Sequence, residues 1–164
     1  MLQRVIMSVQ ENIIPTLQHL TNNLNKSGVD TVIAGDCINE DKSANSDPSI
    51  HDGKADKSAL YITDSESAYH TLRQQGKYVL PYRHEGNSDM NFAGALYVIE
   101  QIEDIDYETV DMAYRRLAGL PWEILTTKRC IIRETMAEDI DSFYQIYAEP
   151  EITKYMEDLY ADRD

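Results

Sequence analysis

Residues 59–82 read ALYITDSESAYHTLRQQGKYVLPY and hold the pattern that decides the fold, a strand, a helix and a second strand. The run 59–63 is short, apolar and rich in strand-forming residues, which predicts a buried strand. Residues 77–82 predict the second strand. Because proline cannot donate to a strand ladder, Pro81 indicates that this strand ends there or lies at a sheet edge.

The helix between these two strands has recognisable start and stop residues. Asp64 and Ser65 are both good N-cap residues, and Gly76 is a good residue for ending the helix. The apolar residues of the segment share one face of the expected helix: Ala68, Tyr69 and Leu72.

The alternation of strands and helices continues toward the C-terminus. Residues 83–91 are polar and predict a loop, and the apolar run within 92–100 predicts another strand. Asp106 then caps a helix that we expect to end at Gly119. Strands that alternate with helices predict an α/β fold, a small parallel Rossmann-like sheet with flanking helices.

Toward the N-terminus the same rules predict a helix, a strand and a loop. Residues 2–26 carry apolar residues at helical spacing, with a break or kink at Pro15. Residues 29–35 are β-branched and predict a buried strand. Residues 39–58 are too polar to bury enough surface to offset the entropy of ordering, so we expect a mobile loop.

The last part of the chain has its own pattern. Residues 130–132 predict a strand, and 135–138 (TMAE) predict a capping box between Thr135 and Glu138. An amphipathic helix should follow and stop at Pro150, with a second helix starting near Glu151. The apolar face expected for the first of these helices is Ile140, Phe143, Tyr144 and Tyr147.

The chain therefore divides into two expected parts. Residues 1–125 form the α/β leader, and residues 126–164 form a separate part. Residues 120–128 connect them, and we expect Trp122, the single tryptophan, to pack at the junction.

Composition excludes several classes of function. The net charge of -14 repels phosphate backbones and anionic lipids, so we expect no nucleic-acid or membrane partner. Cys37 and Cys130 are far apart and have no zinc-ligand spacing, so we expect no metal site and two free thiols. No apolar run is long enough for a membrane span or a signal peptide, and a cytoplasmic location is expected.

The stretch RCIIRETMAEDIDSFYQIYAEPEITKYMEDLY, residues 129–160, resembles the opening of a GNAT-family N-acetyltransferase. Members of that family commonly begin with a strand of the form R-L-x-L-R, a threonine-acidic capping turn and two helices. The run from Ala59 through MAYRRLAGLPWEIL, residues 112–125, also resembles a leader found before GNAT domains. The resemblance implies acetyl transfer from acetyl-CoA to an amine.

The same resemblance implies a cofactor loop that this sequence lacks. GNAT enzymes hold the acetyl-CoA pyrophosphate on a loop of the form Q/R-x-x-G-x-G/A that leads into a helix. Residues 129–164 contain no glycine, so no cofactor-binding or catalytic residue can be assigned there. We expect a GNAT domain cut off before its acetyl-CoA site, inactive alone, with exposed faces that could pair in a homo-oligomer.

Residues 59–87 are similar to the late part of a HAD-like phosphatase. That chemistry needs a nucleophilic aspartate and a second aspartate two positions later, both near Mg²⁺. Asp36 is the best candidate nucleophile, but position 38 is isoleucine. Asp64, with Glu66 nearby, could match the late metal-binding acid, but we expect Asp64 to be a plain N-cap residue instead.

A polar cluster after the strand at 77–82 is the best candidate for small-ligand binding. Ligands of open α/β sheets bind beyond the carboxyl ends of the strands. The candidate ligand-binding residues are Asp64, Ser65, His84, Glu85 and Asn87. For the segment 84–87 we favour the simpler interpretation, a solvated loop with a turn at Gly86-Asn87. The leader is thus either a ligand-binding or interaction module, or a HAD-like phosphatase.

Overall fold

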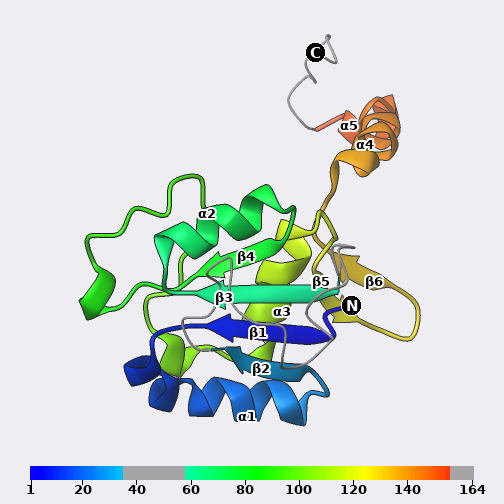
Figure 1. Cartoon of the computed structure of the whole chain (residues 1–164). Coiled ribbons are helices and arrows are strands. Elements are labelled where there is room, and N and C mark those ends of the chain that lie inside the picture. The colour runs from blue at the N-terminus through cyan, green and yellow to red at the C-terminus, as the bar shows by residue number, and fades with distance from the viewer. Residues whose placement is uncertain (35–57, 156–164) are drawn as a thin grey trace. The chain divides into compact units, whose positions relative to one another are not determined.

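The computed structural model describes residues 1–34 and 58–155 (Figure 1). The chain divides into two compact units, Met1–Gly119 and Leu120–Asp164, called unit 1 and unit 2 below. The predicted mobile loop at 39–58 lies, except for Ser58, outside the described residues, as do Asp36 and Cys37.

Unit 1 is built on a four-stranded sheet in which every pair of neighbours is parallel. The strand order is β2-β1-β3-β4. The strands are β1 (Arg4–Ser8), β2 (Asp30–Ala34), β3 (Ala59–Thr63) and β4 (Tyr78–Pro81). The predicted α/β class, with a parallel sheet flanked by helices, is confirmed, and β4 is one of the two edge strands of this sheet, as Pro81 indicated.

The predicted N-terminal helix is wrong over its first third. Arg4–Ser8 is a strand, and the helical part begins with the 3-10 helix η1 (Glu11–Leu17), which contains Pro15, followed by α1 (Gln18–Lys26). The strand pairs with β2 on one side and with β3 on the other. A central strand covered on both faces is apolar almost throughout, and such a short run cannot be told from a buried helix by periodicity alone.

The strand predicted within 92–100 is also wrong. Only an isolated parallel bridge joins Ile99 to Tyr82, supported by hydrogen bonds from Ile99 N to Pro81 O (2.8 Å) and from Arg83 N to Ile99 O (2.7 Å). Gly94, with φ 78°, lies in a turn within this segment. The segment therefore occupies the place of a fifth strand but pairs at one residue only.

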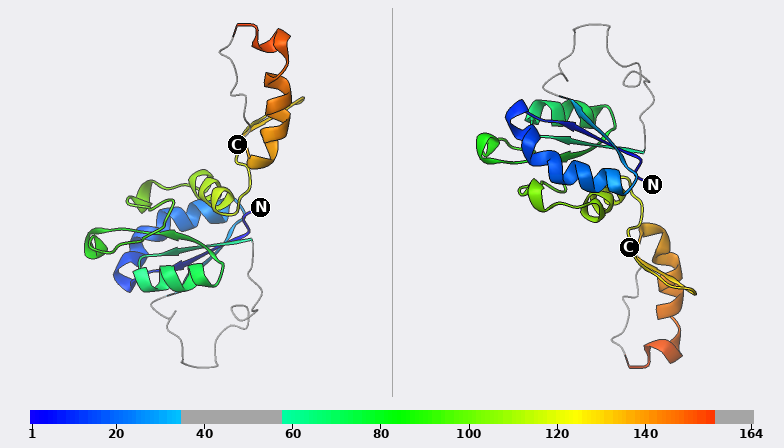
Figure 2. Two further views of the ribbon diagram at one scale, coloured as in Figure 1. Left: turned by 90° about the horizontal axis from the view of Figure 1, so that it is seen from above. Right: turned by 90° about the horizontal axis from the view of Figure 1, so that it is seen from below.

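Helices cover both faces of the sheet. The helix α1, the 3-10 helix η4 (Ile102–Asp104) and α3 (Tyr107–Leu117) lie on one face, and α2 (Glu66–Gln74) lies on the other (Figure 2). The larger core lies on the first face and is built from β1, β3, α1 and α3. Its largest fully buried side chains are Met7, Leu17, Leu20, Leu24, Leu60, Ile62 and Ile102.

The predicted helix ends are confirmed in unit 1. Ser65 Oγ accepts from Ala68 N at the start of α2, and Asp106 Oδ1 accepts from Thr109 N (2.9 Å) at the start of α3. The bonds from the Thr109 amide and hydroxyl lower the pKa of the Asp106 carboxyl. Gly76 and Gly119 follow the two helices with positive φ, which only glycine adopts without strain.

Unit 2 is a hairpin followed by short helices. It contains the antiparallel strands β5 (Glu123–Thr126) and β6 (Ile131–Arg133), the 3-10 helix η5 (Ala137–Asp139), and the helices α4 (Ile140–Tyr147) and α5 (Pro150–Thr153). The strand and both helices predicted here are confirmed. The segment 120–128, predicted as a connection only, contributes β5 because it pairs with β6.

The predicted capping box of unit 2 is displaced by one residue. Asp139, rather than Glu138, accepts the hydrogen bond from a backbone amide, that of Met136 (2.9 Å). The Asp139 carboxylate also accepts two hydrogen bonds from Arg133, which stabilise it beside the Met136 amide. Throughout residues 1–34 and 58–155, no helix is long and apolar enough to cross a lipid bilayer.

Candidate functional site

The predicted ligand-binding residues lie at the carboxyl edge of the sheet in unit 1. In the order β2-β1-β3-β4 the chain crosses from β2 over β1 to β3, so the topological switch point lies between β1 and β3. Ligands of open α/β sheets bind at such points. Gln10 follows β1 and Asp64 follows β3, and these two residues meet there.

Asp64 is buried at this switch point. The residue is 1% exposed, and its Oδ2 accepts a hydrogen bond from Gln10 N at 3.0 Å. Ser65, not Asp64, caps α2, so the side chain of Asp64 is left to join two strand ends. A buried carboxylate is tolerated because these bonds compensate part of its desolvation.

His84 contacts the same oxygen of the Asp64 carboxylate. Its Nε2 lies 3.4 Å from Asp64 Oδ2, and the His84 side chain is 10% exposed. Its Nδ1 accepts a hydrogen bond from Gly86 N at 3.1 Å. A neutral ring that accepts at Nδ1 carries its proton on Nε2, so the proton points at Asp64. Both ring nitrogens are therefore occupied.

Gly86 is the residue that permits this ring position. A Cβ atom at Gly86 would lie 3.0 Å from Cε1 and 3.2 Å from Nδ1 of His84. Any larger residue would push the imidazole away from its bond with the Gly86 amide. The role of Gly86 is therefore to leave room for the His84 ring and to donate a hydrogen bond to it, rather than to bind a ligand.

Asn87 is the most completely bonded residue of the cluster. It is 0% exposed, and its Nδ2 donates to Asp64 O (2.8 Å) and Tyr82 O (2.9 Å). Its Oδ1 accepts from His84 N at 2.6 Å. The side chain therefore ties the chain after β3 to the chain after β4. We call Asp64, His84 and Asn87 the anchor cluster.

The remaining predicted residues do not join the anchor cluster. Ser65 caps α2, and Glu85 is exposed on the 3-10 helix η3 (Glu85–Asn87). Glu66 does not share a site with Asp64, since its carboxylate contacts His70 at 3.8 Å. Within the described ranges 1–34 and 58–155, no group of three His, Cys, Asp or Glu residues could hold a metal ion.

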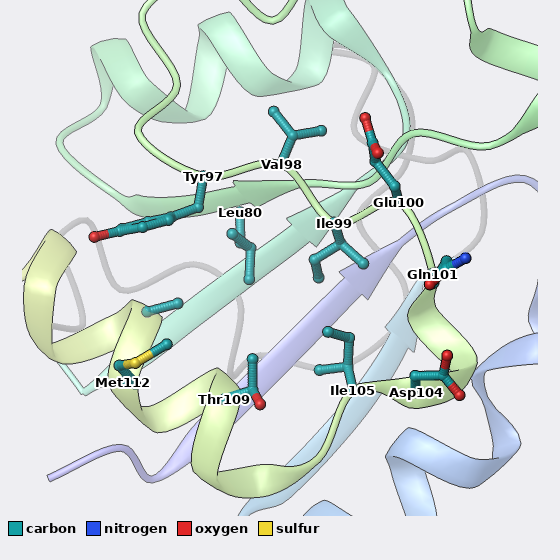
Figure 3. Close-up of a pocket in the computed structure, with 11 residues that line it drawn as sticks. Leu80, Tyr97, Val98, Ile99, Glu100, Gln101, Asp104, Ile105, Thr109 and Met112 are labelled. Atoms are coloured by element: carbon teal, nitrogen blue, oxygen red, sulfur yellow. The ribbon is translucent and has the colours of Figure 1, made fainter. Parts of the chain in front are cut away.

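A cleft in unit 1 was missed by the sequence reasoning. It has a volume of about 630 Å³ and lies between residues 97–105 and α3, against Leu80 of β4 (Figure 3). This size falls in the usual range for ligand sites. Its apolar floor is formed by Leu80, Ile99, Ile105, Met112 and Ala113, and its polar rim by Glu100, Gln101, Asp104 and Thr109. These residues come from separate elements, and no local motif marks them.

Unit 2 has a smaller cleft between β6 and α4, with a volume of about 400 Å³. Arg133 on β6 binds Asp139 through two bonds, Nη1 to Oδ2 (2.8 Å) and Nη2 to Oδ1 (2.7 Å). The Arg133 guanidinium, assisted by the Met136 amide, lowers the pKa of the Asp139 carboxyl to about 2. The pair fixes the turn between the strand and the helix.

Substituting Arg133→Gln should raise the pKa of Asp139 toward the ordinary value of about 3.9. The rise should stop short of it, because the Met136 amide still favours the ionised form. In the parent chain the pair stabilises the turn above pH ~4 and loses that effect as the pH falls toward the folded-state pKa. A carbon-detected NMR titration of the Asp139 carboxyl checks this, with Arg129→Gln as control. An unchanged pKa in Arg133→Gln would assign the depression to the turn alone.

Comparison with known proteins adds no identity to this geometry: no family model, curated protein or solved structure matches the chain.

Proposed function

We propose that the chain is the N-terminal part of a GNAT-type N-acetyltransferase, which moves an acetyl group from acetyl-CoA to an amine. The observation that carries the proposal is the order of elements in unit 2. The strand β6, the turn fixed by Asp139 and the helices α4 and α5 follow one another in the segment that resembles the opening of a GNAT domain.

The exposed surface of unit 2 supports the same proposal. None of its described residues is buried, although many are large and apolar. The exposed apolar side chains include Ile124, Leu125, Ile131, Ile132, Ile140, Phe143, Ile146 and Ile152. Contiguous surfaces of this kind are covered by other protein surface in functional assemblies. An acyltransferase domain built onto β6 and α4 would supply that cover.

The anchor cluster has a structural role in this proposal. Both nitrogens of His84 and both polar atoms of the Asn87 side chain contact other residues of the protein: Asp64, Tyr82, Gly86 and the His84 backbone. A general base needs a nitrogen within reach of the substrate proton, and His84 offers none without breaking one of these bonds. The cluster therefore holds the carboxyl ends of β3 and β4 together rather than performing the chemistry.

The 164 residues alone should not bind acetyl-CoA, because no glycine follows β6 to form the pyrophosphate loop. Calorimetric titration with acetyl-CoA should give no saturable heat. Saturable binding to this chain would show that the cofactor site has been placed wrongly.

The deciding experiment is to sequence the reading frame beyond codon 164 and to express the longer protein. We expect an open frame with a Q/R-x-x-G-x-G/A segment, and release of CoA from acetyl-CoA in the presence of an amine. The 164-residue chain is the matched control and should release none. A stop codon, or a continuing frame without that segment, overturns the proposal.

A further inference from the structure

The sheet of unit 1 has an open edge beside the 630 Å³ cleft. We call residues 97–101 the edge segment. The N–H and C=O groups of Ile99 both bond to the chain around β4, with partners Pro81 O and Arg83 N. In a parallel ladder the next residues direct their backbone groups to the opposite side. Within the described part of the chain the backbone groups of Val98 and Glu100 have no hydrogen-bond partner, and by this rule we expect them to face away from β4.

The side chains of the edge segment alternate between the two faces of the sheet. Ile99 points toward Ile105 and belongs to the core on the α3 face, whereas Val98 packs against the core on the α2 face and Glu100 points away from Ile105, although both also line the margin of the cleft (Figure 3). A strand added at this edge would alternate in the same way. Every second side chain would enter the cleft under α3, and the others would lie beside Glu100.

The two faces differ in chemistry. The floor of the cleft is mostly aliphatic and therefore suits apolar side chains. On the other face the Glu100 carboxylate is 68% exposed and is only loosely paired, with Arg83 Nη1 at 3.5 Å. Asp104 adds a second carboxylate at the cleft rim, and the chain as a whole carries a net charge of -14. Basic side chains therefore complement this edge.

We propose that the edge segment binds an extended peptide of alternating aliphatic and basic residues, which adds a strand to the sheet of unit 1. Main-chain bonds to Val98 and Glu100 supply much of the affinity, and the cleft selects the aliphatic side chains. The basic residues lie beside Glu100. This binding is independent of the proposed acetyltransferase activity.

The test uses the whole 164-residue chain and the peptide Ac-Lys-Val-Lys-Val-Lys-Val-NH₂. In ¹⁵N NMR spectra the amides of Val98 and Glu100 should shift and saturate, with a dissociation constant between about 10 µM and 1 mM, as for small transient interfaces. The amides of Asp30–Ala34, on the opposite edge strand β2, should not move. No saturable shift, or shifts confined to another surface, overturns the proposal.

Three variants separate the contributions. Val98→Pro removes one outward N–H while leaving the Ile99 bonds, and it should weaken binding at least about tenfold. Met112→Trp fills the cleft and should weaken binding similarly, which keeps the test decisive if the proline variant does not fold. Glu100→Gln should cost about two- to fivefold, as expected for an exposed ion pair. Glu11→Gln, an exposed acid on η1, is the matched control and should change nothing.

A second peptide distinguishes strand addition from simple filling of the cleft. The same sequence N-methylated at its two central residues cannot form the ladder, and it should not bind. Equal binding of the methylated peptide, or the same shifts with butylammonium alone, would mean that the cleft takes small organic cations, and the proposal would be wrong.

Discussion

Replacing Asn87 with alanine should lower the free energy of unfolding of unit 1 by about 3 kcal/mol. Asn87 is fully buried, and its amide satisfies the carbonyls of Asp64 and Tyr82 and the amide of His84. Alanine can replace none of these bonds, so three backbone groups, two of them in buried bonds, lose their partner at once. For a domain of this size the melting temperature should fall by about 10 °C.

Denaturant unfolding followed by circular dichroism measures the effect. Asn22→Ala is the matched control, since Asn22 is exposed on α1, and alanine should leave the stability there unchanged or slightly raised. Asn87→Asp keeps an acceptor for His84 N but loses both donated bonds, so it should be at least as destabilising as alanine. A loss below about 1 kcal/mol in Asn87→Ala would mean that water replaces the amide and that the anchor cluster does not hold the strand ends.

Local chemistry explains why the segment 59–82 was predicted correctly. Its strands are short and apolar, Ser65 is a strong N-cap residue and Gly76 adopts a positive φ. Each of these features acts over a few residues, so the sequence alone carries the information. The helix Tyr107–Leu117 was predicted for the same reason, from its cap at Asp106 and its end at Gly119.

The errors lie where long-range pairing decides the conformation. Arg4–Ser8 is a strand because β2 and β3 flank it, and both partners are distant in sequence. Residues 95–99 have the composition of a strand, yet only Ile99 reaches β4. The β-propensity of a segment describes how well its residues suit a sheet. It does not determine whether another strand lies alongside to form the hydrogen bonds.

The membership of the anchor cluster was partly predictable. Carboxyl ends of parallel strands meet at one edge of the sheet, which places Asp64 and His84 close together. The sequence could not predict that the polar atoms of His84 and Asn87 would all be hydrogen-bonded within the protein, because this depends on which atoms face one another in the folded chain. The Gly86 amide at His84 Nδ1 and the Asn87 amide at two carbonyls turn a candidate ligand site into a structural one.

Separating the two units should show that nearly all the cooperative stability lies in unit 1. The buried apolar core of the described chain lies within residues 2–114. The described residues of unit 2, 120–155, form a two-stranded hairpin and short helices, and none of these residues is buried. A hairpin of this kind is marginally stable in water without a third strand or a covering surface. Residues 120–164 alone should therefore show no cooperative thermal transition.

Residues 1–119 alone should melt within about 3 °C of the full chain, since they keep every side chain that is buried among the described residues. They should also bind far less of an apolar-surface dye such as ANS, because the exposed isoleucines and Phe143 of unit 2 are gone. Sedimentation of both chains adds the test of association: a full chain that self-associates and a monomeric 1–119 would place the homo-oligomer contact on unit 2. A drop of 10 °C or more in 1–119, or a cooperative transition in 120–164, would contradict this division of stability. Either result would mean that unit 2 contributes stability through buried side chains of its own. Its exposed apolar residues would then no longer support the proposal that an acyltransferase domain covers β6 and α4.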